Sequence, residues 1–199
     1  MLPDPSTDHI YWLRDQAAAG TAAETAGPTL APGERLDVDV AIVGGGYTGL
    51  WTAIALTDID PSLRVAVLEQ ATVAFGASGR NGGFCQASLT HGLANGIRHF
   101  PEELERLEHE GLDNLRGLIE FTRANGIECD LEVTGTIAFA DQPYQVEEFR
   151  AWVDEAAGYG ERLEFWDRER AYDEVHSPLW LAALHSPPGR DVMVDPDKL

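Results

Sequence analysis

A run of three glycines followed by Tyr-Thr-Gly carries the strongest chemical signal in this sequence. Residues 44–49 match the pattern G-x-G-x-x-G. In this pattern Gly44 allows a tight turn, Gly46 leaves room for a diphosphate beside the backbone, and Gly49 allows a helix to pack closely on a sheet. The N–H groups and the positive dipole end of that helix attract phosphate. The pattern predicts a dinucleotide site formed by its own residues, Gly44, Gly46, Tyr47, Thr48 and Gly49.

A carboxylate further along the chain indicates which dinucleotides are compatible with this site. Glu69 ends the apolar run 64–69, at roughly the distance downstream that the pattern requires. We expect its carboxylate to accept hydrogen bonds from the hydroxyls of an adenosine ribose, with Gln70 beside it in the site. A 2′-phosphate would be repelled there, so NADP is disfavoured. FAD and NAD both remain compatible with the motif.

A second glycine-rich loop, Phe-Gly-Ala-Ser-Gly-Arg-Asn-Gly-Gly, occupies residues 75–83. Such a loop would be surplus in a simple NAD domain, whereas the long FAD molecule needs a second place where backbone can approach closely. Arg80 would bring positive charge near the diphosphate or the flavin ring. The loop therefore favours FAD over NAD. Its predicted cofactor-binding residues are Gly76, Ala77, Ser78, Arg80, Asn81, Gly82 and Gly83.

The elements that position these loops follow from the hydrophobic pattern. Residues 38–43 are a β-branched run typical of a strand buried on both faces. Residues 50–56 read as a helix, and residues 64–69 as a second strand. A strand, a helix and a parallel strand form one crossover unit, so we expect a βαβ unit over residues 37–70.

Further helices and strands are predicted beyond the second loop. The amphipathic pattern indicates helices from Pro101 to Asn125, over 143–159 and over 167–175, and strands over 134–140, 180–185 and 192–194. The pair Asp195-Pro196 is a helix-start signature only a few residues before Leu199. We therefore expect a chain that is truncated relative to a complete fold.

The composition of the chain argues against several classes of binding partner. The chain has 34 acidic and 14 basic side chains and a net charge of -20, which argues against nucleic acid and membrane surfaces as partners. Cys85 and Cys129 form neither a metal-ligand spacing nor a disulfide framework, so we expect no metal site and a reducing, cytoplasmic setting. The N-terminus lacks the pattern of a secretory signal.

The segment VAIVGGGYTGLWTAIAL, the strand end at Glu69 and the loop FGASGRNGG resemble FAD-dependent amine and amino-acid oxidases of the D-amino-acid oxidase superfamily, in particular the gamma-glutamylputrescine oxidase type. Similar elements occur over most of the chain, at residues 11–12, 126–130, 134–136 and 194–196. The resemblance implies oxidation of a C–N bond of an amine or amino acid by hydride transfer to flavin, with oxygen as the expected electron acceptor.

The resemblance also implies an α/β fold in which a Rossmann-like FAD domain is interrupted by an α+β substrate domain. The expected divisions are a leader at 1–36, the first part of the FAD domain at 37–130, a partial substrate domain at 131–193 and the start of a return segment at 194–199.

Family members are considerably longer than 199 residues. We therefore expect the residues that hold the substrate to lie mostly beyond Leu199, and no catalytic residue is assigned. Two alternatives stay open: a truncated FAD-binding remnant without catalysis, and an NAD-dependent dehydrogenase, which the second glycine loop disfavours. His91, just beyond that loop, is either a neighbour of the active site or an ordinary loop histidine.

Overall fold

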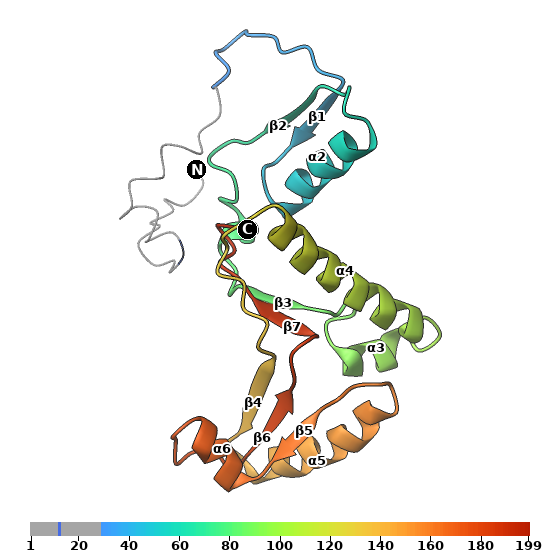
Figure 1. The fold of residues 1–199 in the computed structure, drawn as a ribbon, viewed down its shortest axis with the longest axis vertical. Helices are drawn as coiled ribbons and strands as arrows, with labels where there is room; N and C mark the ends of the chain where they lie inside the picture. The colour runs from blue at the N-terminus through green and yellow to red at the C-terminus, as the bar shows by residue number, and fades with distance from the viewer. Residues whose placement is uncertain (1–11, 13–28) are drawn as a thin grey trace. The chain divides into compact units, whose positions relative to one another are not determined.

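The computed structural model describes residue 12 and residues 29–199, so most of the predicted leader, Tyr11 included, lies outside the described residues. The chain forms two compact units, Met1–Gly82 with Asp195–Leu199, and Gly83–Val194 (Figure 1). The division between these compact units falls at Gly82. Strand β3, which follows Gly82, pairs with a strand near the end of the chain, and this draws the segment after Gly82 into the second unit. The assignment of the units to cofactor and substrate remains a prediction.

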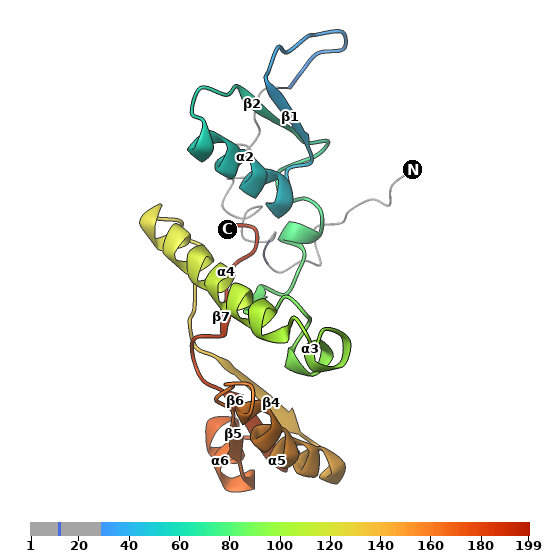
Figure 2. The ribbon, with the colours of Figure 1, turned by 90° about the vertical axis from the view of Figure 1, so that its right-hand side faces the viewer.

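The first unit contains the predicted βαβ crossover. Strands β1 (Val40–Val43) and β2 (Val65–Leu68) pair in parallel along their whole length, and helix α2 (Tyr47–Ile59) connects them. Figures 1 and 2 show α2 lying against one side of the strand pair. At the start of the strands the Arg64 guanidinium binds the Asp39 carboxylate at 3.0 Å. This ion pair lowers the pKa of the Asp39 carboxyl to about 2.

The expectation that β1 is buried on both faces is wrong. Val40 and Ile42 are half-buried, whereas Ala41 and Val43 are exposed, and Val43 is 88% exposed. Successive side chains of a strand point to opposite faces, so this alternation means that one face of β1 is covered and the other is open. Apolar β-branched residues indicated the strand correctly, but they could not indicate how many layers cover it.

The second unit contains a three-stranded antiparallel sheet in the order β4–β6–β5. Its strands are β4 (Thr136–Ala140), β5 (Glu164–Trp166) and β6 (Ala182–Ser186). Helix α5 (Pro143–Ala157) connects β4 to β5, and helix α6 (Arg168–Glu174) connects β5 to β6. Both helices contact the sheet, as the lower part of Figure 1 shows.

The rest of the second unit combines two helices with a two-stranded ribbon. Strand β3 (Phe84–Gln86) pairs antiparallel with β7 (Asp191–Met193). Helix α3 (Leu93–His99) precedes α4 (Leu104–Ala124), which begins one turn later than predicted because the residues from Pro101 form a turn. Apolar side chains of α3, α4 and α5 form one buried cluster. Its members are Leu93, Leu104 and Ala156, with Ile97, Trp152 and Leu163 packed against them.

Most of the helices and strands that the hydrophobic pattern did not predict are short. The stretch between residues 75 and 96 shows no sequence period, yet it contains the 3-10 helix η3 (Ala77–Gly79), strand β3 and the start of helix α3. Strand β5 was not predicted either. Three-residue elements are too short to display a period, so their formation depends on tertiary pairing. Among the helices that the structure describes, none combines the length and apolar character needed to cross a bilayer.

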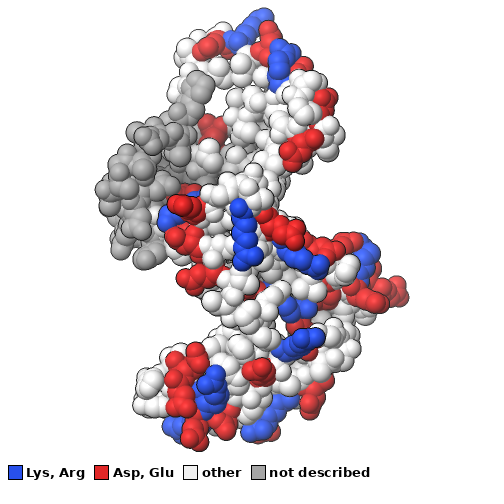
Figure 3. All heavy atoms as spheres, viewed as in Figure 1, with Lys and Arg blue, Asp and Glu red and all other residues white. Residues whose placement is uncertain are grey.

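Charged side chains of both signs are interspersed over the visible surface (Figure 3). On α4, Arg106 lies 2.9 Å from Glu103 and 2.8 Å from Glu110, and Arg116 lies 2.9 Å from Asp113. Each of these side chains is about half exposed, so each pair contributes at most about 1 kcal/mol. The acidic helix face is therefore explained by solvation.

Candidate functional site

The glycine turn after β1 requires glycine at two positions for different reasons. Gly44 has a φ of +105°, a conformation that strains any L-residue. At Gly49 an added Cβ would lie 2.1 Å from the carbonyl oxygen of Gly44. The Gly44 N–H donates to the Leu68 carbonyl at 2.8 Å, which ties the turn to the end of β2. The turn is therefore held between a strand end and the first turn of α2.

Backbone N–H groups surround the N-terminus of α2 (Tyr47–Ile59). Gly46 caps the helix in an extended conformation and offers no side chain. Tyr47 N–H donates to Ser78 Oγ at 3.0 Å. Within the described part of the chain, the N–H groups of Gly46 and Thr48 meet no acceptor. Together with the helix dipole, these two groups suit an anion such as a phosphate.

Glu69 lies at the same end of the strand pair and is already engaged by backbone. Its Oε2 accepts from Gly45 N–H at 2.8 Å, and its Oε1 accepts from Ala71 N–H at 2.9 Å. These two hydrogen bonds, that of Gly45 first, lower the pKa of the Glu69 carboxyl. The side chain is exposed, so its oxygens keep lone pairs for a ligand hydroxyl. The structure thus adds a turn-holding role to the one predicted from sequence.

The second glycine loop is joined to the first by hydrogen bonds. Ala74 N–H donates to the Gly45 carbonyl at 2.9 Å, and Gly79 N–H donates to the Ala74 carbonyl at 2.8 Å. Ala74 has a φ of +62°, which is uncommon for a residue with a Cβ. With the bond from Tyr47 N–H to Ser78 Oγ, these contacts place the loop at the N-terminus of α2.

The last residues of the chain also contact the N-terminus of α2. Tyr47 Oη donates to the Pro196 carbonyl at 2.6 Å. Asp195 Oδ1 accepts from Asp197 N–H at 3.0 Å, and its carbonyl accepts from Leu199 N–H at 3.2 Å. This single capped turn has the hydrogen bonds expected of the helix-start signature. Burial and the neighbouring Asp195 raise the pKa of the Asp197 carboxyl.

For the remaining residues predicted to bind the cofactor, the structure shows their contacts within the chain, and their cofactor role stays a prediction. The guanidinium of Arg80 lies 4.3 Å from the centre of the Phe75 ring, and Arg80 is exposed. Asn81 Nδ2 donates to the carbonyls of Ala77 and Ser78 at 3.2 and 2.6 Å, so its side chain stabilises η3. Gln70, Gly76, Ala77 and Gly82 are exposed, and Gly83 belongs to the second unit.

Three residues of this arrangement were not predicted. Gly45 occupies a variable position of the motif, yet its N–H and its carbonyl both hold neighbouring segments. Ala74 carries no sequence signal for a left-handed conformation. Pro196 lies 149 positions from Tyr47, and a contact at that separation has no local signature.

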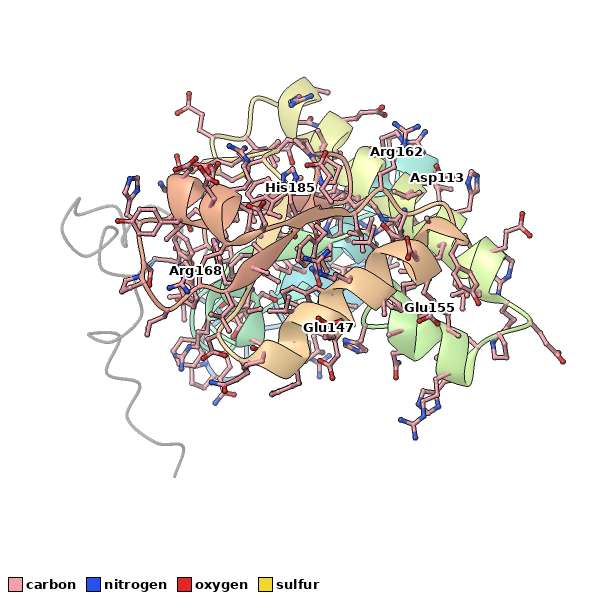
Figure 4. All side chains as sticks on the ribbon, turned by 90° about the horizontal axis from the view of Figure 1, so that it is seen from below. Asp113, Glu147, Glu155, Arg162, Arg168 and His185 are labelled. Carbon is pink, nitrogen blue, oxygen red and sulfur yellow. The ribbon has the colours of Figure 1, made fainter. Side chains whose placement is uncertain are left out.

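The histidines and cysteines of the second unit that could be reactive contact neighbouring protein groups or lie exposed. His91 is exposed, with a φ of +58°. His185 Nδ1 lies 3.1 Å from Glu164 Oε2, and its ring stacks on Trp166; Figure 4 shows it at the sheet. Burial raises the pKa of the Cys85 thiol. The described residues contain no group of three or more side chains suited to a metal.

Comparison with known proteins identifies the family of the chain. Residues 39–199 match the model of the family described as DAO, FAD dependent oxidoreductase. The chain is 52% identical over 157 residues to gamma-glutamylputrescine oxidoreductase of Escherichia coli, which covers 76% of this chain and 35% of that protein. The chain thus spans about a third of the length of the curated relatives it matches.

Solved structures share the fold. Glycine oxidase from Bacillus cereus has a TM-score of 0.60 at 21% identity, over 81% of this chain and 41% of that one. The L-alpha-glycerophosphate oxidase from Mycoplasma pneumoniae, solved with FAD bound, has a TM-score of 0.58 at 20% identity, over 81% and 40%. At these identities the likeness supports the fold alone.

Proposed function

Because this chain belongs to the DAO family of FAD-dependent oxidoreductases, we propose that its β1–α2–β2 unit holds the adenosine diphosphate part of FAD. FAD is the cofactor of this family. The residues present fit it. A Cβ added at Gly44 would meet nothing within 4 Å, so that side of the turn is open. A Cβ added at Gly46 would meet Ser78 Oγ at 2.9 Å, so glycine is needed where the two loops meet.

Each residue of the turn has a separate task in this proposal. The N–H groups of Gly46 and Thr48 donate to the diphosphate, and the dipole of α2 stabilises its negative charge. The Glu69 carboxylate accepts from ribose hydroxyls and disfavours a 2′-phosphate. Ser78 keeps the second glycine loop beside the first. When bound, FAD supplies an acceptor for a hydride.

One observation carries the proposal furthest. Ser78 accepts the first N–H of α2, so both glycine-rich loops meet at one helix N-terminus. An NAD site needs only the first loop, whereas the longer FAD molecule uses a second close approach of backbone. The meeting of the loops therefore favours FAD.

For the reaction, we propose oxidation of a C–N bond of a small amine or amino acid, with oxygen as electron acceptor. The names of the relatives support this class, since they include gamma-glutamylputrescine oxidoreductase and glycine oxidase. The spacing of Cys85 and Cys129 predicts no disulfide framework, which supports a reducing, cytoplasmic setting.

Flavin spectroscopy on the 199-residue chain tests the reaction. The chain is loaded with FAD, freed of oxygen and mixed with a panel of amines and amino acids, with the matching alcohols as controls. We expect the absorbance of oxidised flavin to bleach with an amine or amino acid and to return when oxygen is admitted. Bound flavin that none of the panel bleaches would mean that the chain binds FAD without catalysis.

The substitution Gly46→Val tests the proposed cofactor contact. Its side chain would occupy the approach to the N–H groups of α2, so FAD affinity should fall by about tenfold or more. Since it would also push against Ser78, the variant Ser78→Ala is the matched control. A fall in affinity with Gly46→Val that Ser78→Ala does not reproduce supports direct crowding of the diphosphate. Unchanged FAD affinity in Gly46→Val would refute the proposed role.

A further inference from the structure

The second unit contains a cavity of about 430 Å³ that has no part in the proposed cofactor site. This volume falls within the range of small-molecule sites, roughly 300–1,000 Å³. Its walls come from α3, α4, α5, the β3–β7 ribbon and one face of the sheet. Apolar side chains form much of the lining, among them Leu93, Trp152, Leu163 and Leu184.

The polar part of the lining has an excess of negative charge. Arg190 lies between two carboxylates, bonded to Glu108 and 2.7 Å from Glu161. Asp191 adds a third carboxylate, which accepts from Gln86 Nε2 at 2.9 Å and from Thr136 Oγ1 at 3.2 Å. One guanidinium thus faces three carboxylates. Both hydrogen bonds to Asp191 come from neutral groups, so they do not offset the excess of negative charge.

The partners of Glu108 show where this excess is least compensated. Oε2 of Glu108 binds Arg190, whereas its buried Oε1 accepts no hydrogen bond from the described part of the chain. A buried carboxylate oxygen without a donor is costly, and the described residues supply no donor to this one. Burial raises the pKa of the neighbouring Glu161 carboxyl despite Arg190, and Glu108 and Asp191 raise it further.

We propose that this cavity binds an organic ammonium ion with an aliphatic body. The ammonium group lies among the carboxylates of Glu108, Glu161 and Asp191 and offsets their negative charge, while the aliphatic part lies against Leu93, Trp152 and Leu184. The second unit alone carries this proposal. It does not depend on FAD, nor does it require that the bound ammonium be the group that is oxidised.

Other ligand classes match the lining less well. A phosphate or carboxylate would meet three carboxylates, and the one guanidinium present is already held by two of them. A metal ion needs a cluster of ligating side chains, and the described residues contain no such group. An uncharged alcohol would fill the apolar part but would leave the negative charge uncompensated.

Calorimetric titration with three probes of equal chain length tests the site: n-butylammonium, n-butanol and butyrate. We expect saturable binding of n-butylammonium, at least about tenfold weaker binding of n-butanol, and no binding of butyrate. Resonances of the Trp152 indole should shift with n-butylammonium and should not shift with butyrate. The titration is repeated on Gly46→Val, which should keep ammonium binding while its FAD affinity falls, so that failure of one proposal is distinguishable from failure of the other.

Two variants and one control locate the binding. Glu108→Gln should weaken n-butylammonium binding by about tenfold or more. Ala138→Leu keeps all three carboxylates but fills the cavity, and it should abolish binding even if Glu108→Gln fails to fold. Glu147→Gln removes an exposed carboxylate of α5, outside the cavity lining (Figure 4), and should bind as the parent does. Equal binding of n-butanol and n-butylammonium, or unchanged binding in Ala138→Leu, would overturn the proposal.

Discussion

Gly49 and Gly117 are both helical glycines, yet their surroundings differ completely. A Cβ at Gly49 would lie 2.1 Å from the Gly44 carbonyl oxygen, whereas a Cβ at Gly117 would meet nothing within 4 Å. Gly49→Ala should therefore lower the free energy of unfolding by about 2 kcal/mol or more. Gly117→Ala should raise it by up to about 1 kcal/mol, since alanine is the better helix former. Urea unfolding of both variants checks this, and equal stability of Gly49→Ala and the parent would contradict it.

Glu69 gives the turn a defined dependence on pH. The N–H groups of Gly45 and Ala71 lower the folded-state pKa of its carboxyl. The stabilisation is therefore fully present above the unfolded-state pKa and is lost as pH falls through the folded-state pKa. Glu69→Gln should lose less thermal stability than the parent on acidification. Carboxyl titration by NMR is the direct check, and a Glu69 carboxyl that titrates in its usual range would contradict the assignment.

The sequence predicted these residues unequally well. The glycines and Glu69 belong to a pattern whose spacing reflects backbone geometry, so the turn and the acidic strand end were predictable. The contacts of Ala74 and Pro196 were not, because each depends on segments that meet only after folding. The guanidinium of Arg80 lies over Phe75, a contact that the sequence did not indicate, and its expected place near the diphosphate or the flavin stays a prediction.

At the scale of elements, the contact between the η3 loop and α2 is testable on its own. Ser78 Oγ accepts the Tyr47 N–H at the start of α2 and so does the work of a helix cap, although it comes from a distant part of the chain. Ser78→Ala should lower the free energy of unfolding by about 1 kcal/mol, as loss of a cap does. Ser78→Thr, which keeps the hydroxyl, should recover part of this loss. No difference between the two variants would show that the hydroxyl is unimportant.

The long helices were predictable, whereas several of the short elements were not. The period of α4 and α5 shows in the sequence because each spans several turns, and both helices are confirmed. Strands β3, β5 and β7 have three residues each, and β3 and β5 went unpredicted for want of a period. The open face of β1 illustrates another limit, because composition indicates a strand without indicating what covers it.

At the scale of the whole molecule, the two units carry separate proposals. The glycine loops, Glu69 and the final turn belong to the unit formed by Met1–Gly82 with Asp195–Leu199, and the acidic cavity belongs to Gly83–Val194. Loss of FAD binding should therefore leave ammonium binding intact, and the reverse should also hold. The family match over residues 39–199 spans both units.

Cofactor selectivity tests the central claim most directly. The purified 199-residue chain is titrated calorimetrically with FAD, NAD and NADP under one set of conditions. The structure predicts saturable binding of FAD, weaker binding of NAD, and binding of NADP that is weaker than that of FAD by about tenfold or more, because Glu69 repels the 2′-phosphate. Tighter binding of NAD than of FAD, or no binding of FAD at all, would contradict the account.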